Sequence, residues 1–230
     1  MKNLRVFLIG LMICALLIIM AACGEKSNDG DKTQQNTDLT ISEEEKVIDD
    51  KIVAEINGHK ITGQYYNSLY IQTKMKRHQF GQDIDDQEAI KNDTLDELIA
   101  HELLRQEAEA KGIHVTKDEV EEEFTKLKNE NGEQLNDYLE EFQLTEESFK
   151  EQIMYSLVYM KYVGKEIPVK VSDEEAKELY EELKKDDENL PTFDDIEGVL
   201  KEQISQRKQQ EKLQKKIKQL KETADIETKL

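Results

Sequence analysis

The chain has 230 residues, of which 51 are acidic and 32 are Lys or Arg, so its formal net charge is −19 at pH 7. This acidic balance argues against nucleic-acid binding, which needs a basic face, and favours a well-solvated, self-repelling surface. With only two prolines and no tryptophan, and with abundant Glu, Lys, Leu and Gln, the composition is typical of a mostly helical protein.

The first 22 residues have the pattern of a secretory signal peptide. Lys2 and Arg5 precede an apolar run from Val6 to Met20, and small residues follow that run. The run is shorter than the ~20 apolar residues that a membrane-spanning helix needs. We therefore expect residues 1–22 to be removed and the mature chain to lie outside the cytoplasm.

The sequence MAACG, which ends at Gly24, resembles the lipobox of bacterial lipoproteins. In that family the cysteine thiol takes a diacylglyceryl group, so the resemblance implies lipid attachment at Cys23 and anchoring to the cell membrane on its extracytoplasmic face. More than one acyl chain holds a protein firmly at a membrane. The alternatives are ordinary cleavage after Ala22 and an uncleaved anchor. With Cys14 removed and Cys23 lipidated, no cysteine remains for a disulfide, a metal or a nucleophile.

Residues 23–50 are polar and lack apolar periodicity, which predicts a lipidated N-terminus followed by a flexible linker. The folded body is expected over residues 51–230. Alternation over Ile52–Ile56 predicts a short strand, and Asn57-Gly58 is a tight-turn signal. Thr62 is placed to cap a helix that runs towards Phe80.

The stretch from Gln87 to Lys111 predicts the long helix around which the rest of the chain is organised. Its apolar residues form two stripes at helical spacing, and together they are wider than one core-facing stripe needs. The stripes are Leu95, Leu98, Ile99 and Leu103, and Ala100, Leu104 and Ala108. We therefore expect neighbours to contact this helix from at least two sides, and Gly112 to end it.

Three capping signals mark the helices that follow. Thr116 with Glu119 forms a capping box, and Asn131-Gly132 ends that helix before a shorter one; Thr145 begins the next. Ser172 with Glu175 is a second capping box.

Alternation over Ile167, Val169 and Val171 predicts a second strand, which we expect to pair with Ile52–Ile56. Pro168 places that strand at an edge. The final helix is expected from about Asp194 to Glu222, and its C-terminal half is basic, which suggests charge complementarity with the acidic remainder.

In order along the chain stand VAEINGHKIT, LLRQEAEAKGIHVTKDEV, LTEESFKEQI and VKVSDEEAKELY. This order, from roughly Ile52 to Tyr180, resembles the N-terminal region of the SurA/PrsA-type extracytoplasmic folding factors. The resemblance implies a mainly α, multi-helix chaperone module over residues 51–230, with a short two-stranded β pairing and a long C-terminal helix. It also implies that the partners are unfolded secreted polypeptides, and that the module can form a homodimer.

One feature of that family is missing from the sequence. Its enzymatic members carry a parvulin-type prolyl isomerase domain after the segment that matches VSDEEAKELY, but here only Glu181–Thr192 lies before Phe193. Twelve residues are too few for a domain, which needs ~40–50. No EF-hand loop, histidine–carboxylate spacing or nucleophile elbow is present either. The sequence therefore predicts no catalytic, cofactor-binding or metal-binding residue.

These features favour a membrane-anchored chaperone-like lipoprotein that binds secreted polypeptides without covalent chemistry. A prolyl isomerase and a scaffold lipoprotein with one folded partner are the alternatives. A solute-binding lipoprotein is disfavoured because alternating strand–helix units are missing. Two sets of side chains could line a binding groove, although helical spacing places such residues more often in a core. They are Tyr65, Tyr66, Tyr155 and Tyr159, and Met75, Met154 and Met160.

Overall fold

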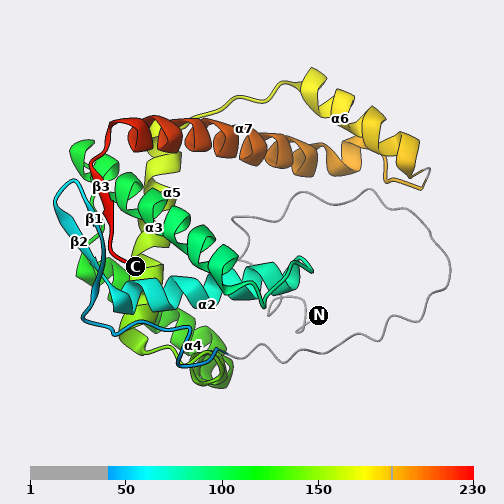
Figure 1. The fold of residues 1–230 in the computed structure, drawn as a ribbon. Helices are drawn as coiled ribbons and strands as arrows, with labels where there is room; N and C mark the ends of the chain where they lie inside the picture. Colours follow the sequence, from blue (N-terminus) through cyan, green and yellow to red (C-terminus); the bar gives the residue numbers. More distant parts are fainter. Residues whose placement is uncertain (1–40, 188) are drawn as a thin grey trace. The chain divides into compact units, whose positions relative to one another are not determined.

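The computed structural model describes residues 41–187 and 189–230, so the predicted signal peptide, Cys23 and the first part of the predicted linker lie outside the described residues. Figure 1 shows the elements in sequence colours. They are β1 (Ile52–Ile56), β2 (His59–Thr62), α2 (Gly63–Gln79), α3 (Gln87–Ala110), α4 (Lys117–Glu141), α5 (Glu146–Glu166), α6 (Asp173–Asp186), α7 (Phe193–Thr223) and β3 (Ile226–Thr228). The predicted mainly α class, with a small antiparallel sheet and a long C-terminal helix, is confirmed.

The described chain divides into two compact units. The large unit comprises residues 41–162 and 216–230, and the small unit comprises residues 163–187 and 189–215. The large unit therefore contains the three strands, α2, α3, α4 and most of α5, and α7 contributes its last residues to it.

The sheet has the strand order β2-β1-β3, and both pairings are antiparallel. Asn57 and Gly58 have positive φ angles of 52° and 80°. Two positive φ angles define the two-residue turn whose twist suits a hairpin, and for this reason the Asn-Gly pair joins β1 to β2.

The predicted pairing of Ile167–Val171 with β1 is wrong. Those residues form no strand, and the two neighbours of β1 are β2 and β3. β2 lies two residues away in the sequence, so it forms at little cost in loop closure. Val171 instead packs against the apolar cluster of the small unit.

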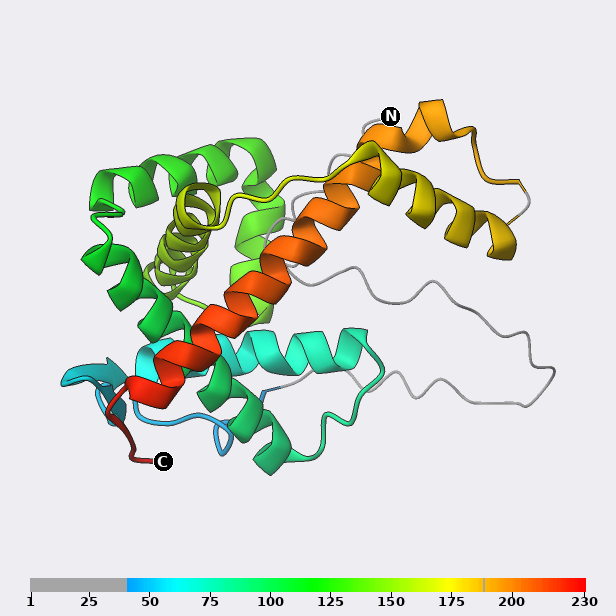
Figure 2. The same cartoon turned by 90° about the horizontal axis from the view of Figure 1, so that it is seen from above.

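Two apolar cores hold the large unit together. In the first, α2 and α3 pack on the sheet, and Val53, Ala54 and Ile56 of β1 are inaccessible to solvent. Figure 2 shows α2 and α3 crossing beside the strands. Both stripes of α3 are buried, since Leu98 and Leu103 belong to this core while Leu104 and Ala108 are inaccessible too, and the expected two-sided packing of this helix is confirmed.

The second core joins the later part of α2 to α4 and α5, and Phe149 lies at its centre with Phe124 and Leu139 nearby. Gly132 has φ 37° and ψ −107°, so α4 bends there before its second part folds back onto the core. The predicted break at Asn131-Gly132 is this bend.

The predicted linker reaches too far into the chain, because its described part, residues 41–50, packs on α2. Asn67 donates to the Val47 carbonyl at 2.8 Å and accepts from the Val47 N–H at 2.9 Å. Lys74 and Glu45 form an ion pair at 2.6 Å with side chains only 8 % and 5 % exposed. Burial by itself raises the pKa of Glu45, but the hydrogen bonds from Lys74 and Ser42 outweigh burial, so the pKa of Glu45 is lowered. The boundary of the folded body therefore lies before residue 51.

The small unit is a pair of helices. Ala176, Leu179 and Tyr180 of α6 pack against Leu200 and Ile204 of α7, and Figures 1 and 2 show the two helices side by side. The predicted capping box of Ser172 and Glu175 begins α6. Residues 187–192 alone connect α6 to α7, so no further domain is inserted between these helices.

Candidate binding pocket

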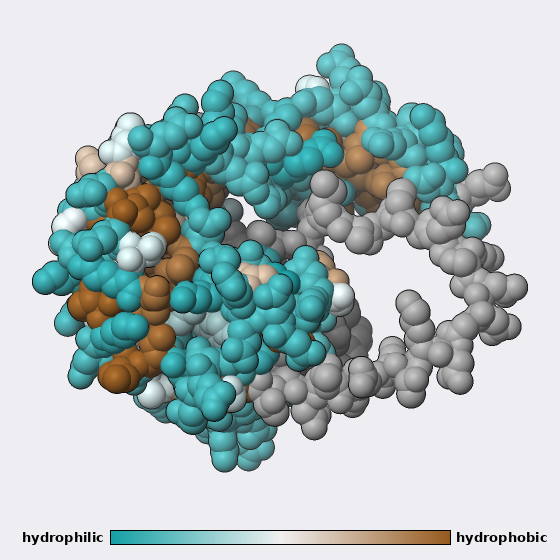
Figure 3. Space-filling view, in the orientation of Figure 1, coloured by the Kyte–Doolittle hydropathy of each residue, from teal (hydrophilic) through white to brown (hydrophobic). Residues whose placement is uncertain are grey.

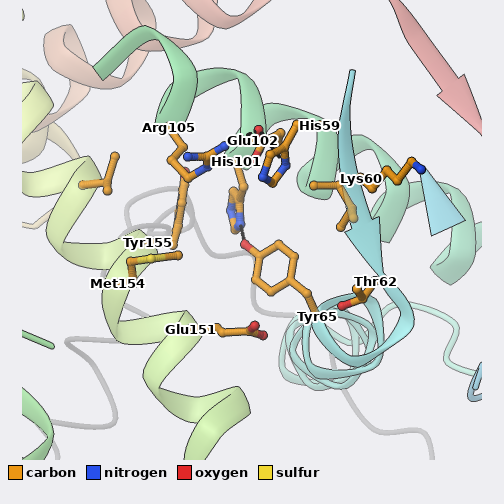
Figure 4. A pocket seen from close by; sticks show the side chains of 12 residues that line it. His59, Lys60, Thr62, Tyr65, His101, Glu102, Arg105, Glu151, Met154 and Tyr155 are labelled. Atoms are coloured by element: carbon orange, nitrogen blue, oxygen red, sulfur yellow. Dashed lines mark hydrogen bonds and ion pairs between the residues drawn. The ribbon is translucent and has the colours of Figure 1, made fainter. Parts of the chain in front are cut away.

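A pocket of about 230 Å³ opens in the large unit between β2, α3 and α5. Figure 4 shows it from close by, with the side chains that line it. They come from the hairpin (His59, Lys60, Ile61, Thr62), from α2 (Tyr65), from α3 (His101, Glu102, Arg105) and from α5 (Glu151, Met154, Tyr155, Val158). The volume lies below the ~300–1,000 Å³ of pockets that hold drug-sized ligands, so the pocket suits one side chain or a short segment of a larger partner.

The rings of Tyr65, His101 and Tyr155 line one side of the pocket and form an aromatic wall. His101 stacks on Tyr155 with ring centroids 3.3 Å apart and an interplanar angle of 18°. On its other side His101 Nδ1 lies 2.7 Å from the Tyr65 hydroxyl. In the tautomer with Nε2 protonated, Nδ1 accepts a hydrogen bond from that hydroxyl, and Nε2 faces Glu97 at 3.7 Å. The imidazole of His101 thereby connects α3 to α2 and to α5.

Burial keeps this wall neutral. It lowers the pKa of His101 to about 3, so the imidazole is uncharged at neutral pH. Burial, together with the nearby Tyr155 and Glu151, raises the pKa of Tyr65 well above its usual range. A histidine with so low a pKa is a poor general base, and the wall is therefore suited to packing against a ligand more than to moving protons.

Glu102 is the polar hub behind the pocket, with only 5 % of its side chain exposed. Arg105 binds both of its carboxylate oxygens, with Nε at 2.8 Å and Nη2 at 2.7 Å. Gln106 donates to Glu102 at 2.6 Å and to the Ile56 carbonyl at 3.0 Å, and His59 Nδ1 lies 3.2 Å away. These bonds fasten the hairpin to α3, and they neutralise the charge of Arg105.

The α5 wall is amphipathic. Met154, Tyr155 and Val158 recur at helical spacing and present apolar surface. Glu151 lies one turn earlier, and Figure 4 shows its carboxylate pointing from α5 towards Tyr65. Its Oε2 is buried and has no hydrogen-bond partner among the described residues. Burial, aided by the charge of Glu147, raises the pKa of Glu151 to about 7, which marks a carboxyl group that lacks a counter-charge.

The residues that line the pocket include no serine or cysteine, and the imidazole of His101 is uncharged at neutral pH. Within residues 41–187 and 189–230, no group of three or more His, Cys, Asp or Glu is placed to hold a metal ion. In the same part of the chain, no helix combines the length and the apolar character needed to cross a bilayer.

The structure places only some of the tyrosines and methionines that were considered for a binding groove in the pocket. Tyr65, Tyr155 and Met154 line the pocket. The others do not: Tyr66 lies in the first core, and Met75 packs on the second core. Tyr159 is half-buried outside the pocket lining, and Met160 is 48 % exposed.

Sequence reasoning missed β2 and Glu151. The pattern His59-Lys60-Ile61-Thr62 after the Asn-Gly turn was a usable hairpin signal. Nothing local distinguished Glu151 from the other acidic residues of its helix.

Comparison with known proteins gives two matches. A family model described as SurA-like N-terminal domain matches residues 2–163. The chain is also 32 % identical over 157 residues to a protein of Caldanaerobacter subterraneus subsp. tengcongensis named foldase protein PrsA. The match covers 64 % of this chain and 47 % of the relative, so the chain spans about half of that protein. No solved structure matches.

Proposed function

Because the chain belongs to the SurA-like N-terminal domain family, within a group of chaperones and foldases, we propose that it is an extracytoplasmic chaperone. It binds unfolded secreted polypeptides without covalent chemistry and uses no cofactor. Residues 51–230, extended at the N-terminal side by residues 41–50, are its client-binding module.

The observation that supports this function most directly is the composition of the pocket. It joins the flexible side chain of Met154, which adapts to many shapes, and the apolar Val158 with an aromatic wall and the unpartnered carboxyl group of Glu151. Figure 3 shows hydrophobic residues gathered around the strands, and a second group over α6 and α7, on a surface that is otherwise mainly hydrophilic. Such a patch is typical of a surface that receives another polypeptide.

The proposal includes a membrane anchor. Residues 1–22 act as a signal peptide, Cys23 takes the lipid, and residues 24–40 link the anchor to the folded body. Acyl labelling of the chain expressed in a bacterium tests this part. The unchanged chain incorporates labelled palmitate and sediments with membranes, whereas Cys23→Ser does neither; equal labelling of both chains contradicts the anchor.

Chaperone activity is tested with residues 24–230, which lack the lipid. At near-stoichiometric amounts they suppress the aggregation of a chemically denatured secreted protein. The same sample is assayed for isomerisation of a proline peptide, and no rate above background is expected. Suppression without isomerisation supports a holdase.

Two results contradict this function. Isomerisation above background means that the chain is an enzyme of the prolyl isomerase type. Absence of both activities, with one stoichiometric partner in a co-purification from membranes, means a scaffold lipoprotein.

A further inference from the structure

The pocket follows an open edge of the sheet. All four residues of β2 line it, yet successive side chains of a strand point to opposite faces. Four consecutive residues can share one pocket only where the backbone edge of the strand faces it. β1 covers the other edge of β2, so the edge that faces the pocket has no neighbouring strand within residues 41–187 and 189–230.

The hydrogen bonds of β1 identify which backbone groups are free on that edge. Asn57 N–H donates to Asp225 O, and Lys229 N–H donates to Val53 O, so the odd-numbered residues of β1 face β3. Ala54 and Ile56 therefore face β2, where their partners are Ile61 and His59.

It follows that the backbone N–H and C=O groups of His59 and Ile61 point towards β1 and bond to it. Gly63 N–H donates to Lys51 O at the other end of β2, beyond the bulge between Ile52 and Ala54. By alternation with Ile61 and Gly63, the N–H groups of Lys60 and Thr62 point away from β1. The carbonyl of Lys60 points the same way.

The opposite wall carries a group that needs a partner. Arg105 is neutralised by Glu102 and Glu109, and Figure 4 shows the Lys60 side chain extending away from Tyr155 and Glu151. Among the described residues, the Oε2 of Glu151 is buried and has no hydrogen-bond partner. A ligand that enters between β2 and α5 is therefore complementary when it brings a cation beside the rings of Tyr65 and Tyr155.

We propose that the pocket binds an extended polypeptide segment that adds to the free edge of β2 and directs a lysine or arginine side chain to Glu151. An extended chain offers N–H and C=O groups at the spacing of β2, and alternate side chains then point into the pocket. This mode rests on the proposed chaperone function and explains how clients of unrelated sequence bind, since backbone bonds are common to all of them. Glu151 adds a preference for basic segments.

A second copy of this chain is a poorer occupant of the same edge. In the antiparallel register centred on Lys60, whose free backbone groups can bond to those of the second copy, two copies of Lys60 lie opposite each other, and like charges directly opposite in a sheet are destabilising. A lysine on an edge strand is a common device against such self-pairing, but it leaves the N–H and C=O of the backbone available to an unfolded segment.

The backbone part of the proposal is tested at Lys60. Lys60→Pro removes an N–H that makes no bond to β1, and proline is tolerated at an edge strand. Lys60→Ala removes the same side chain and keeps the N–H. The probe is a short fluorescein-labelled peptide of alternating valine and serine with one central lysine, titrated into the full chain in lipid nanodiscs.

Loss of one hydrogen bond predicts that Lys60→Pro binds this peptide about five- to tenfold more weakly than Lys60→Ala does. Circular dichroism and thermal unfolding verify that both variants fold. Equal affinities of the two variants overturn the strand addition.

Hydrogen exchange of the unmodified chain gives a second measurement that needs no variant. Peptide binding should slow exchange at the amides of Lys60 and Thr62, whereas His59 and Ile61 are already protected by β1. Unchanged exchange at Lys60 and Thr62 in the peptide-saturated chain overturns the strand addition as well.

The preference for a basic residue is tested with the same peptide carrying glutamine in place of its lysine. We expect about a tenfold weaker affinity of the unmodified chain for the glutamine peptide, and little difference between the peptides for Glu151→Gln. An undiminished lysine preference in Glu151→Gln overturns the role of Glu151. If the unmodified chain binds neither peptide nor a denatured client, the chaperone function itself fails; if it binds clients but Lys60→Pro and Lys60→Ala behave alike, only the strand addition fails.

Discussion

The two units of the chain are built in different ways. The large unit has two apolar cores that draw residues from the sheet, from four helices and from the C-terminal segment. In the described part of the small unit, a cluster of five buried residues comes from two helices. This unit adds ion pairs at its surface, such as Lys201 with Asp173 at 2.5 Å, and exposed pairs contribute little.

This difference teaches where a pocket can form. A binding site needs walls from separate elements that are held in place by a core, and the large unit supplies both. The small unit presents an exposed apolar side chain, Val199, which is 65 % accessible. Four predictions, which use five substitutions, test this difference between the units, and the one with the greatest expected loss of stability comes first.

Leu98→Ala should destabilise the large unit most. Leu98 is inaccessible to solvent at the centre of α3, and its truncation leaves a cavity among groups from several elements that cannot all close in. We expect the free energy of unfolding to fall by about 3–5 kcal/mol, measured by urea denaturation. A loss below about 1 kcal/mol would show that α3 is not the centre of this unit.

Ile204→Ala should act on the small unit alone. Ile204 is buried between α7 and α6, but fewer neighbours surround it and they can relax more. We expect a local loss of about 2–4 kcal/mol, seen as faster hydrogen exchange in α6 with unchanged exchange in α3. Equal acceleration in both helices would mean that the two units unfold together.

Glu151→Gln should change the pH dependence of the large unit. Glutamate has an ordinary pKa of 4.5, whereas burial and Glu147 raise the pKa of Glu151 to about 7 in the folded chain. Between these values the unfolded chain binds fewer protons than the folded one, so the free energy of unfolding falls as the pH rises from 4.5 to about 7.

Glu151→Gln removes this decrease in the free energy of unfolding with rising pH. After allowance for the partial exposure of Glu151, we expect Glu151→Gln to be more stable than the unchanged chain by roughly 1–2 kcal/mol at about pH 8, and equally stable at about pH 4. Urea denaturation at both pH values measures it. A variant that is less stable at about pH 8 would show that Glu151 has a counter-charge in the free protein.

Ser172→Ala and Thr116→Ala remove the same kind of helix cap from the two units. Each hydroxyl accepts the N–H of the glutamate three residues later, at 3.2 Å in both cases. A lost cap costs about 1 kcal/mol. Because the small unit has the smaller core, we expect Ser172→Ala to accelerate exchange in α6 more than Thr116→Ala does in α4. The reverse order would mean that the small unit is the more stable one.

Much of the helical architecture could be predicted from the sequence. Capping signals and glycine positions placed the starts of α4, α5 and α6 and the ends of α2 and α3, because these signals depend on neighbouring residues only. The two stripes of α3 likewise predicted its central position. The basic half of α7 was correctly matched to acidic partners, as Lys216 with Glu107 and Lys221 with Asp96 show.

The partners of β1 could not be predicted in the same way. β3 follows α7 directly and is only three residues long, and a segment so short has no periodicity of its own. Val171 belongs to an alternating pattern that is typical of a strand, yet it packs against the apolar cluster of the small unit. Short apolar patterns specify that residues are buried, and only long-range packing decides what they are buried against.

The helices, the hairpin turn and the family of this protein could be read from the amino-acid sequence, because each depends on residues that are close together along the chain. The pocket could not, because it forms only when distant segments fold together. The buried and uncharged state of His101, the unpartnered oxygen of Glu151 and the open edge of β2 arise where the hairpin, α3 and α5 converge. Desolvation and strand pairing depend on neighbours that are distant in sequence, and the same residue types elsewhere in this acidic chain lie on a solvated surface.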